Sequence, residues 1–198
     1  MKERDEVFYR LAQKEDILNQ KTNLLDFGCG IGIVMNQYNQ WGIPAESITG
    51  VDISKKRIET GKKQFPHFTF DIIDENLPFK DNQFSLVLVY TVFSSIIDQS
   101  KRMHWAVELD RVLKPCGKIF FYDMIVDNPF NNSVRKITPN DLSQFFTNYS
   151  ISATSLTIWP HLVRSISFCS NLVYPFLAKI NLLHTHLAVV LTKPSRYN

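Results

Sequence analysis

The sequence predicts an α/β protein with a doubly wound, mostly parallel sheet. Apolar stretches of strand length alternate with segments of helical period from residue 22 onward, which is typical of parallel sheets with helices on both faces. Residues 84–90 are almost continuously apolar, as expected of a central strand that is covered on both sides. Three glycines at alternate positions, within 28–32, follow a short apolar run and predict a tight turn between a strand and a helix.

The composition indicates a globular protein. The 198 residues, 44% hydrophobic and 21% charged, predict one domain over 1–198. A net charge of +3 is too small to indicate nucleic-acid binding. The charged segment 1–16 lacks the apolar region of a signal peptide, and no stretch is apolar enough to span a bilayer. The three scattered cysteines argue against a disulfide framework, so we expect a cytoplasmic location.

The first half of the chain opens with a helix and continues with alternating strands and helices. The opening helix is amphipathic, and we interpret it first as a packing helix and second as a flap over the glycine turn. Ser54 follows the second predicted strand and is a suitable N-cap for the next helix. In chain order, the expected elements are a helix over 3–19 within the N-terminal region 1–20, a strand over 22–27, a helix to residue 41, a strand over 48–53, a helix to residue 65 and a strand over 68–73.

The second half continues this alternation. Thr138 and Pro139 are typical of the start of a short helix. His104, Glu108 and Arg111 lie along one line of the helix before it, which favours a surface row of ion pairs. In chain order, the expected elements are a strand over 84–90, a helix over 100–113 that Pro115 and Gly117 terminate, a strand over 118–126, a helix to residue 146, and strands over 149–158 and 186–192.

The segment 159–185 is apolar and aromatic but is interrupted by Pro160 and Pro175. We interpret it as a lid-like insertion that closes over a small-molecule substrate and excludes water. The alternative is an interfacial patch that reaches a lipid-linked acceptor at a membrane surface.

Two carboxylates narrow the ligand of the glycine turn. Asp52 ends the second predicted strand about twenty residues beyond the turn, where such a residue binds ribose hydroxyls. The G-x-G-x-G spacing departs from the G-x-G-x-x-G pattern that packs a pyrophosphate onto a helix. Asp26, directly before the turn, repels a pyrophosphate and attracts a cation. The sequence therefore favours an adenosine-containing, unphosphorylated cation, and S-adenosylmethionine fits this description.

Four motifs resemble the motif series of class I methyltransferases that depend on S-adenosylmethionine. They are LLDFGCGIG at 24–32, GVDIS at 50–54, LPF at 77–79 followed by Phe84, and RVLKP at 111–115. The chain is further similar to a type 11-like subgroup of small bacterial methyltransferases whose substrates are mostly unassigned.

The resemblance implies a Rossmann-like fold and a reaction. The expected sheet has seven mostly parallel strands with an antiparallel last strand. The expected activity is O-methylation of a sugar or a secondary-product-like compound. A quinone-type C-methyltransferase, a cofactor-binding protein without catalysis and an ordinary Rossmann dehydrogenase are the alternatives, and the oligomeric state stays open.

The resemblance also assigns residues to the methionine end of the cofactor. Asp26 and the turn formed by Gly28, Cys29 and Gly30 are expected to hold the methionine moiety. Tyr90, at the end of a predicted strand, is expected to line the same end.

At the adenosine end, Asp52 is expected to bind the ribose hydroxyls and Ile53 to contact the adenine face. Asp74 is assigned to the adenine amino group and Glu75 offers its backbone N–H to the ring. The family usually has one more residue between that Asp and the LPF motif. We prefer Asp74 because it preserves a strand alternation that places three side chains on one face: Phe68, Phe70 and Ile72.

The family usually has Gly-Gly after the LKP of the fourth motif, whereas this chain has Cys116 and Gly117. This turn is expected to lie far from the cofactor. We therefore expect the replacement of the first glycine by Cys116 to have a mild structural effect.

Catalysis and acceptor binding are predicted from residue chemistry. Methyl transfer depends on positioning, and an oxygen nucleophile can need a base. Asp123, in an apolar strand, and His161 are the candidate catalytic residues, because a buried carboxylate is costly unless it is used or paired. No third ligand accompanies His184 and His186, so we expect no metal. The candidate substrate contacts are Phe93, Arg135 and Arg164.

Overall fold

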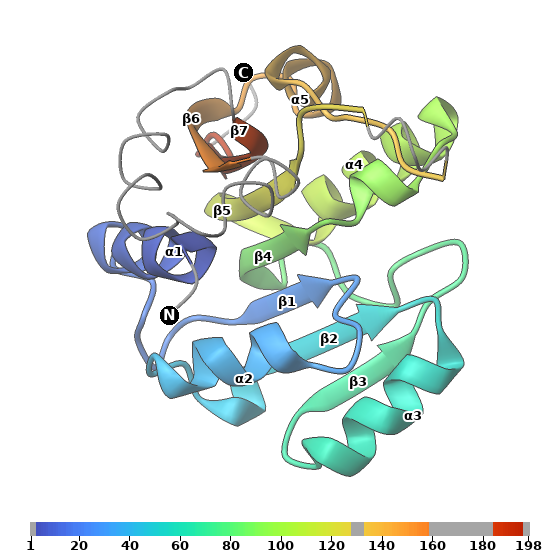
Figure 1. Cartoon of the computed structure of the whole chain (residues 1–198). Coiled ribbons are helices and arrows are strands. Elements are labelled where there is room, and N and C mark those ends of the chain that lie inside the picture. Colours follow the sequence, from blue (N-terminus) through green and yellow to red (C-terminus); the bar gives the residue numbers. More distant parts are fainter. Residues whose placement is uncertain (1–2, 128–132, 159–183, 196–198) are drawn as a thin grey trace, which may run out of the picture.

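A seven-stranded sheet with the order β3-β2-β1-β4-β5-β7-β6 forms the centre of the computed structural model (Figure 1). The structure describes residues 3–127, 133–158 and 184–195. Its strands are β1 (Leu24–Phe27), β2 (Ile48–Asp52), β3 (Thr69–Ile72), β4 (Phe84–Tyr90), β5 (Leu113–Met124), β6 (Ser150–Ile158) and β7 (His184–Thr192). Its helices are α1 (Glu3–Lys14), α2 (Ile33–Gln40), α3 (Lys55–Gln64), α4 (Gln99–Val112) and α5 (Pro139–Phe145), with short 3₁₀ helices η1 (Ala45–Ser47) and η2 (Phe93–Ser95).

The strand pairings confirm the predicted sheet. β1 lies between β2 and β4 and is parallel to both, and β3 and β5 extend the parallel sheet on either side. β7 runs antiparallel to β5 and β6. The chain leaves β1 toward β2 and later returns to the other side of β1 as β4, so the strand order reverses there. In open α/β sheets, such a switch point is where ligands bind, beyond the carboxyl ends of the strands.

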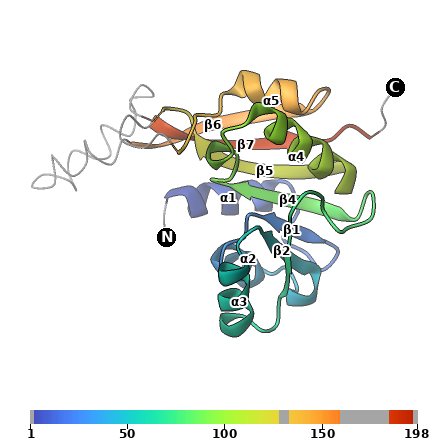
Figure 2. The same cartoon turned by 90° about the vertical axis from the view of Figure 1, so that its right-hand side faces the viewer.

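The two faces of the sheet carry separate hydrophobic cores. Neighbouring residues of one strand point to opposite faces, so Leu24 and Leu25 belong to different cores. Figures 1 and 2 show α1 and α4 on opposite sides of β4 and β5. Both faces of β4 are therefore covered, which explains why residues 84–90 are apolar almost throughout.

Several predicted boundaries change in the structure. α1 ends at Lys14, five residues earlier than expected, and the chain then turns before β1. Pro115 and Gly117 do not terminate α4, because that helix already ends at Val112 and β5 begins at the next residue. Thr138 caps α5 as predicted, through a reciprocal capping box with Asp141.

The alternation expected at the end of β3 is wrong. Phe68 and Phe70 are buried, but Ile72 is 49% exposed and Ile73 is buried instead. The burial pattern shifts because β3 ends at Ile72 and the chain turns into the opposite core, where Ile73 packs.

Among the described residues, no helix combines the length and hydropathy that a membrane crossing requires.

Cys116 occupies a left-handed backbone conformation with a φ of 60°, which glycine adopts without strain. We expect Cys116→Gly to stabilise the fold by about 0.5 kcal/mol, because relief of a left-handed strain of about 1–2 kcal/mol exceeds a glycine entropy cost of about 0.5–1 kcal/mol. Urea unfolding under reducing conditions measures the change. The matched control is Cys116→Ala, which removes the thiol and keeps the strain. Equal stabilisation by both variants would contradict the backbone explanation.

Candidate functional site

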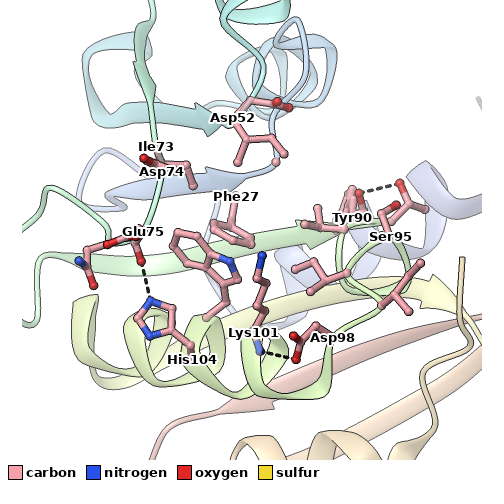
Figure 3. Close-up of a pocket in the computed structure, with 18 of the residues that line it drawn as sticks. Phe27, Asp52, Ile73, Asp74, Glu75, Tyr90, Ser95, Asp98, Lys101 and His104 are labelled. Atoms are coloured by element: carbon pink, nitrogen blue, oxygen red, sulfur yellow. Dashed lines mark hydrogen bonds between the residues drawn. The ribbon is translucent and has the colours of Figure 1, made fainter. Parts of the chain in front are cut away.

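A cavity of about 1100 Å³ opens where β1, β2 and β4 end. It brings together six of the residues predicted to bind the cofactor, and Figure 3 labels four of them: Asp52, Asp74, Glu75 and Tyr90. The six predicted residues are Gly28, Asp52, Ile53, Asp74, Glu75 and Tyr90. Residues far apart in the chain therefore meet at the switch point, as the fold requires.

The glycine turn has a conformation that other residues adopt at a cost. Gly28, Gly30 and Gly32 have φ values of 78°, 59° and 88°. A Cβ atom at Gly28 would lie 2.4 Å from Cγ2 of Val92, whereas a Cβ at Gly30 would meet nothing within 4 Å. Gly28 therefore permits close packing, and the backbone at Gly30 faces open space.

Asp52 is held in one orientation by the backbone. Its Oδ2 accepts a hydrogen bond of 3.0 Å from the N–H of Gly30, and its Oδ1 accepts one of 2.8 Å from the N–H of Ser54. Arg57 adds an ion pair of 3.7 Å. Ile53, the next residue, is 74% exposed at the cavity. The site thus pairs an oriented carboxylate with an exposed apolar surface.

Asp26 is buried beneath the turn, and its Oδ2 has no hydrogen-bond partner among the described residues. Burial raises the pKa of Asp26 to about 7, the charge of Arg4 lowers it, and the charge of Asp52 raises it. An unpartnered buried oxygen is costly unless a ligand satisfies it. Asp26 is not in the cavity wall itself but in the layer behind the turn.

Helix α1 covers the Tyr90 end of the cavity. Phe8 is buried and its ring centroid lies 4.7 Å from that of Tyr90. The Arg4 guanidinium carbon lies 5.3 Å from the Tyr90 ring centroid. The Tyr90 hydroxyl shares a 2.8 Å hydrogen bond with the hydroxyl of Tyr38. α1 thus packs on the sheet, which agrees with the first of the two interpretations of this helix. It also brings Arg4 near Asp26, which the sequence did not indicate.

Cys29 belongs to the turn, but its side chain packs into the core that contains Met35 and not into the cavity wall. A Cβ on Gly50 would lie 2.8 Å from its sulfur and 2.4 Å from the sulfur of Met35. Burial, together with the charges of Asp26 and Asp52, raises the pKa of the Cys29 thiol. Its contribution to the site is therefore its backbone.

Helix α4 holds the loop that carries Asp74 and Glu75. His104 Nε2 lies 2.5 Å from the carbonyl oxygen of Glu75, and the buried Glu108 accepts a hydrogen bond from the N–H of Leu77. Arg111 donates to the carbonyl of Leu77 and to both carboxylate oxygens of Glu108. The hydrogen bond from Arg111 lowers the pKa of Glu108. The predicted ion pair between Glu108 and Arg111 is present, but Glu108 is buried and these side chains also hold the loop.

Asp123 lies behind the cavity wall. It is 1% exposed, and its two oxygens accept hydrogen bonds from the N–H groups of Ser94 and Met124. Burial raises the pKa of Asp123. This arrangement favours a role in anchoring η2 over the predicted role of a base.

Neither of the two described substrate candidates lies in the cavity wall. Phe93 is fully buried, with its ring centroid 5.4 Å from that of Phe121. Arg135 is exposed, and its backbone N–H donates to the carbonyl of Ser94. His161 and Arg164, together with most of the segment 159–185, lie outside the described residues.

Several wall residues carried no signal in the sequence. Thr91 follows β4 with a φ of 57°, an unusual value for a β-branched residue, and strained backbone often marks functional sites. The remaining wall near α4 consists of Val92, Ser95, Ile96, Ile97, Asp98, Lys101 and Trp105. Their common feature, proximity to the end of β4, emerges only from the fold.

In the described part of the chain, no cluster of three His, Cys, Asp or Glu side chains is suited to hold a metal ion. His186 instead stacks on Tyr122, with ring centroids 5.0 Å apart.

Known proteins similar in sequence are methyltransferases. Residues 25–121 match a family model described as a methyltransferase domain. Sterol 4-C-methyltransferase strm-1 of Caenorhabditis elegans is 31% identical over 128 residues, which cover 61% of this chain and 36% of that protein. O-methyltransferase cnsE of Penicillium expansum is 32% identical over 123 residues, covering 58% and 42%. Ubiquinone/menaquinone biosynthesis C-methyltransferase UbiE of Geotalea daltonii is 26% identical over 122 residues, covering 58% and 51%.

The chain thus spans about a third to a half of the length of these relatives. Among solved structures, the [4+2]-cyclase SpnF is similar with a TM-score of 0.68 and 16% identity, covering 97% of this chain and 81% of that chain. A SAM-dependent methyltransferase from Methanosarcina mazei has a TM-score of 0.66 and 14% identity, covering 93% and 98%. At these identities the likeness to both structures shows the fold alone.

The raised pKa of Asp26 predicts that this residue lowers the free energy of unfolding by an amount that depends on pH. Between pH 4 and 7 the folded protein keeps a proton that the unfolded chain has lost, so stability falls as pH rises through this window and levels off above it. We expect Asp26→Asn to be more stable than the parent by roughly 2–4 kcal/mol at pH 8 and nearly equal at pH 4, at about 1.4 kcal/mol per pKa unit.

Chemical unfolding of both proteins at a series of pH values measures this difference. Asp74→Asn, at the exposed rim of the cavity, is the matched control and should show a much smaller effect. A stability difference between Asp26→Asn and the parent that stays constant from pH 4 to 8 would contradict the raised pKa.

Proposed function

We propose that this chain, whose residues 25–121 match a methyltransferase domain model, depends on S-adenosylmethionine and methylates a small molecule. The reaction we propose is O-methylation of a sugar or a secondary-product-like compound. The observation that supports cofactor binding most directly is the Asp26 carboxyl, which is buried behind the glycine turn with one oxygen unpartnered among the described residues.

The charges at the methionine end match the cofactor. S-adenosylmethionine carries an ammonium, a carboxylate and a sulfonium. Asp26 has a free acceptor oxygen for the ammonium, and Arg4 on α1 offers a cation near it for the carboxylate. The exposed backbone at Gly30 allows close approach. We propose that these residues and Gly28 bind the methionine moiety.

The adenosine end is acidic and partly apolar. Asp52 is oriented by two backbone N–H groups and is placed to accept from ribose hydroxyls. We propose that Ile53 contacts the adenine face and that Asp74 and Glu75 contact its polar edge. Three carboxylates along this wall disfavour a pyrophosphate, which argues against a dinucleotide cofactor.

The protein's contribution to the reaction is positioning. When bound, S-adenosylmethionine supplies an electrophilic methyl group on a sulfonium. Methyl transfer needs an aligned nucleophile, so rigid walls contribute most of the catalysis. Tyr90 is fixed by its hydrogen bond to Tyr38, and the buried ring of Trp105 closes the opposite wall. We propose that Val92, Ile96 and Trp105 exclude water from the methyl group.

The cavity wall near α4 indicates which kind of methyl acceptor the site suits. Its apolar residues favour a secondary-product-like compound over a sugar. Asp123 and His161 stay proposed as bases, and Phe93, Arg135 and Arg164 as acceptor contacts. For Asp123 the two backbone hydrogen bonds make a positioning role the better proposal.

A second candidate is C-methylation of a quinone-type acceptor. The apolar wall supports it, since such a reaction suits a pocket without a base beside the methyl group. The similarity to UbiE points the same way. A cofactor-binding protein without catalysis is the third candidate, and an absence of turnover across hydroxylated and quinol acceptors would favour it.

Other expectations from the sequence stay predictions. These are a single domain over 1–198, a lid or membrane-facing role for 159–185, a cytoplasmic location and the absence of nucleic-acid partners.

Asp52→Ala tests the position of the cofactor. We expect it to weaken binding of S-adenosylhomocysteine by roughly 1.5–3 kcal/mol, the scale of hydrogen bonds to a charged group. Isothermal titration calorimetry measures the affinity, and Asp52→Asn, which keeps one acceptor oxygen, shows whether the turn survives. Glu59→Ala, on the exposed surface of α3, is the control. Unchanged affinity would mean that the cofactor lies elsewhere, and binding of NAD alone would favour a dehydrogenase.

Cofactor affinity should depend on pH through Asp26. Because the ammonium prefers the ionised carboxylate, the affinity for S-adenosylhomocysteine should fall about tenfold per pH unit below a pKa of about 7. Above that value it should level off. Calorimetry between pH 5.5 and 8.5 measures the profile, and Asp26→Asn should flatten it. A profile that is the same in both proteins would exclude Asp26 as the acceptor of the ammonium.

A further inference from the structure

Lys101 is a positively charged residue of the cavity wall near α4. Among the described residues, its ammonium group forms no ion pair. The other wall cation, Arg57, pairs with Asp52. Figure 3 shows the Lys101 side chain rising from α4 into the cavity toward Phe27, away from the carboxylate of Asp98. The dashed contact between Lys101 and Asp98 belongs to the backbone N–H of Lys101, at 3.3 Å. The ammonium group is thus available to a ligand.

The charge of Lys101 does not stabilise helix α4. It is the third residue of α4, in the first turn, where the helix dipole disfavours a cation. Asp98 caps this turn, and its Oδ1 accepts from Ser100 as well as from the N–H of Lys101. The N-terminal end of α4 and the lysine bring positive charge to the cavity wall, and the carboxylate of Asp98 offsets part of it.

Apolar side chains form much of the cavity wall around Lys101. Phe27, Val92, Ile96, Ile97 and Trp105 share the wall with it. Trp105 is buried, whereas Ile97 is 47% exposed. His104, one turn along the helix, is occupied by the carbonyl of Glu75. Apart from Asp98, the acidic residues of the cavity wall (Asp52, Asp74 and Glu75) lie at the adenosine end.

We infer that the methyl acceptor is an amphiphilic acid, with an apolar body against this wall and a carboxylate or phosphate group bound by Lys101. This inference rests on the proposed function, and it narrows the acceptor class. A neutral quinone or sterol would leave the lysine without a partner in the cavity.

The test uses protein loaded with S-adenosylhomocysteine and a matched pair of probes, decanoate and decanol. Calorimetry should show that decanoate binds about tenfold more tightly than decanol, the scale of one interaction with a charged group. Lys101→Gln should abolish this preference and leave decanol binding unchanged, and Lys101→Arg should restore part of it. Lys56→Gln, on the exposed surface of α3, should behave as the parent.

Several outcomes would overturn the inference: equal binding of the acid and the alcohol, no binding of either, or an unchanged preference in Lys101→Gln. The inference would also be overturned if Lys101→Gln bound S-adenosylhomocysteine more weakly than the parent but bound methylthioadenosine equally well. That result would assign the lysine to the carboxylate of the cofactor. Failure of the parent protein to bind S-adenosylhomocysteine would instead contradict the proposed function itself.

Discussion

The glycine turn ties the end of β1 to the end of β2, and the rest of the site depends on this connection. The N–H groups of Gly28 and Cys29 both donate to the carbonyl of Val51, and the N–H of Gly30 donates to the carboxylate of Asp52. These bonds use the backbone donors that a pyrophosphate-binding turn would present to its ligand. They also bring Asp52 near Asp26, whose pKa is raised chiefly by its burial and further by the charge of Asp52. The turn therefore creates an acidic, oriented surface in place of an anion site, and this matches a cationic cofactor.

Buried acids elsewhere in the chain hold loops in place. Glu108 accepts from the N–H of Leu77 and pairs with Arg111, so α4 fixes the loop on the adenosine side of the cavity. Asp123 accepts from the N–H of Ser94, so β5 fixes η2 on the other side. Both carboxylates satisfy backbone donors that would otherwise be buried without partners. The two walls of the cavity are thus positioned from separate strands and helices, which keeps the space between them open.

The sequence predicted the sheet and six residues that meet in the cavity wall, because both depend on local patterns. The alternation of strands and helices, the turn at 28–32 and Asp52 each carry their signal within a few residues. The acceptor end could not be predicted in the same way. Asp123 attracted a catalytic interpretation because a carboxylate in an apolar strand is unusual, yet its partner, the N–H of Ser94, lies 29 residues away. Arg4 and Lys101 are ordinary surface charges in the sequence, and only the packing of α1 and α4 brings them to the site.

The charge distribution of the cavity separates the two halves of the reaction. Most carboxylates of the cavity wall lie where the cofactor is proposed to bind, whereas Lys101, Asp98 and several apolar residues form the wall on the side of α4. A cofactor with one net positive charge would weaken the negative potential of the acidic half on binding. The site near Lys101 would therefore become more attractive to an anion once the cofactor is in place. This coupling gives an electrostatic reason for the cofactor to bind before the acceptor. It operates without any change in the backbone, since both walls are already held by Glu108 and Asp123.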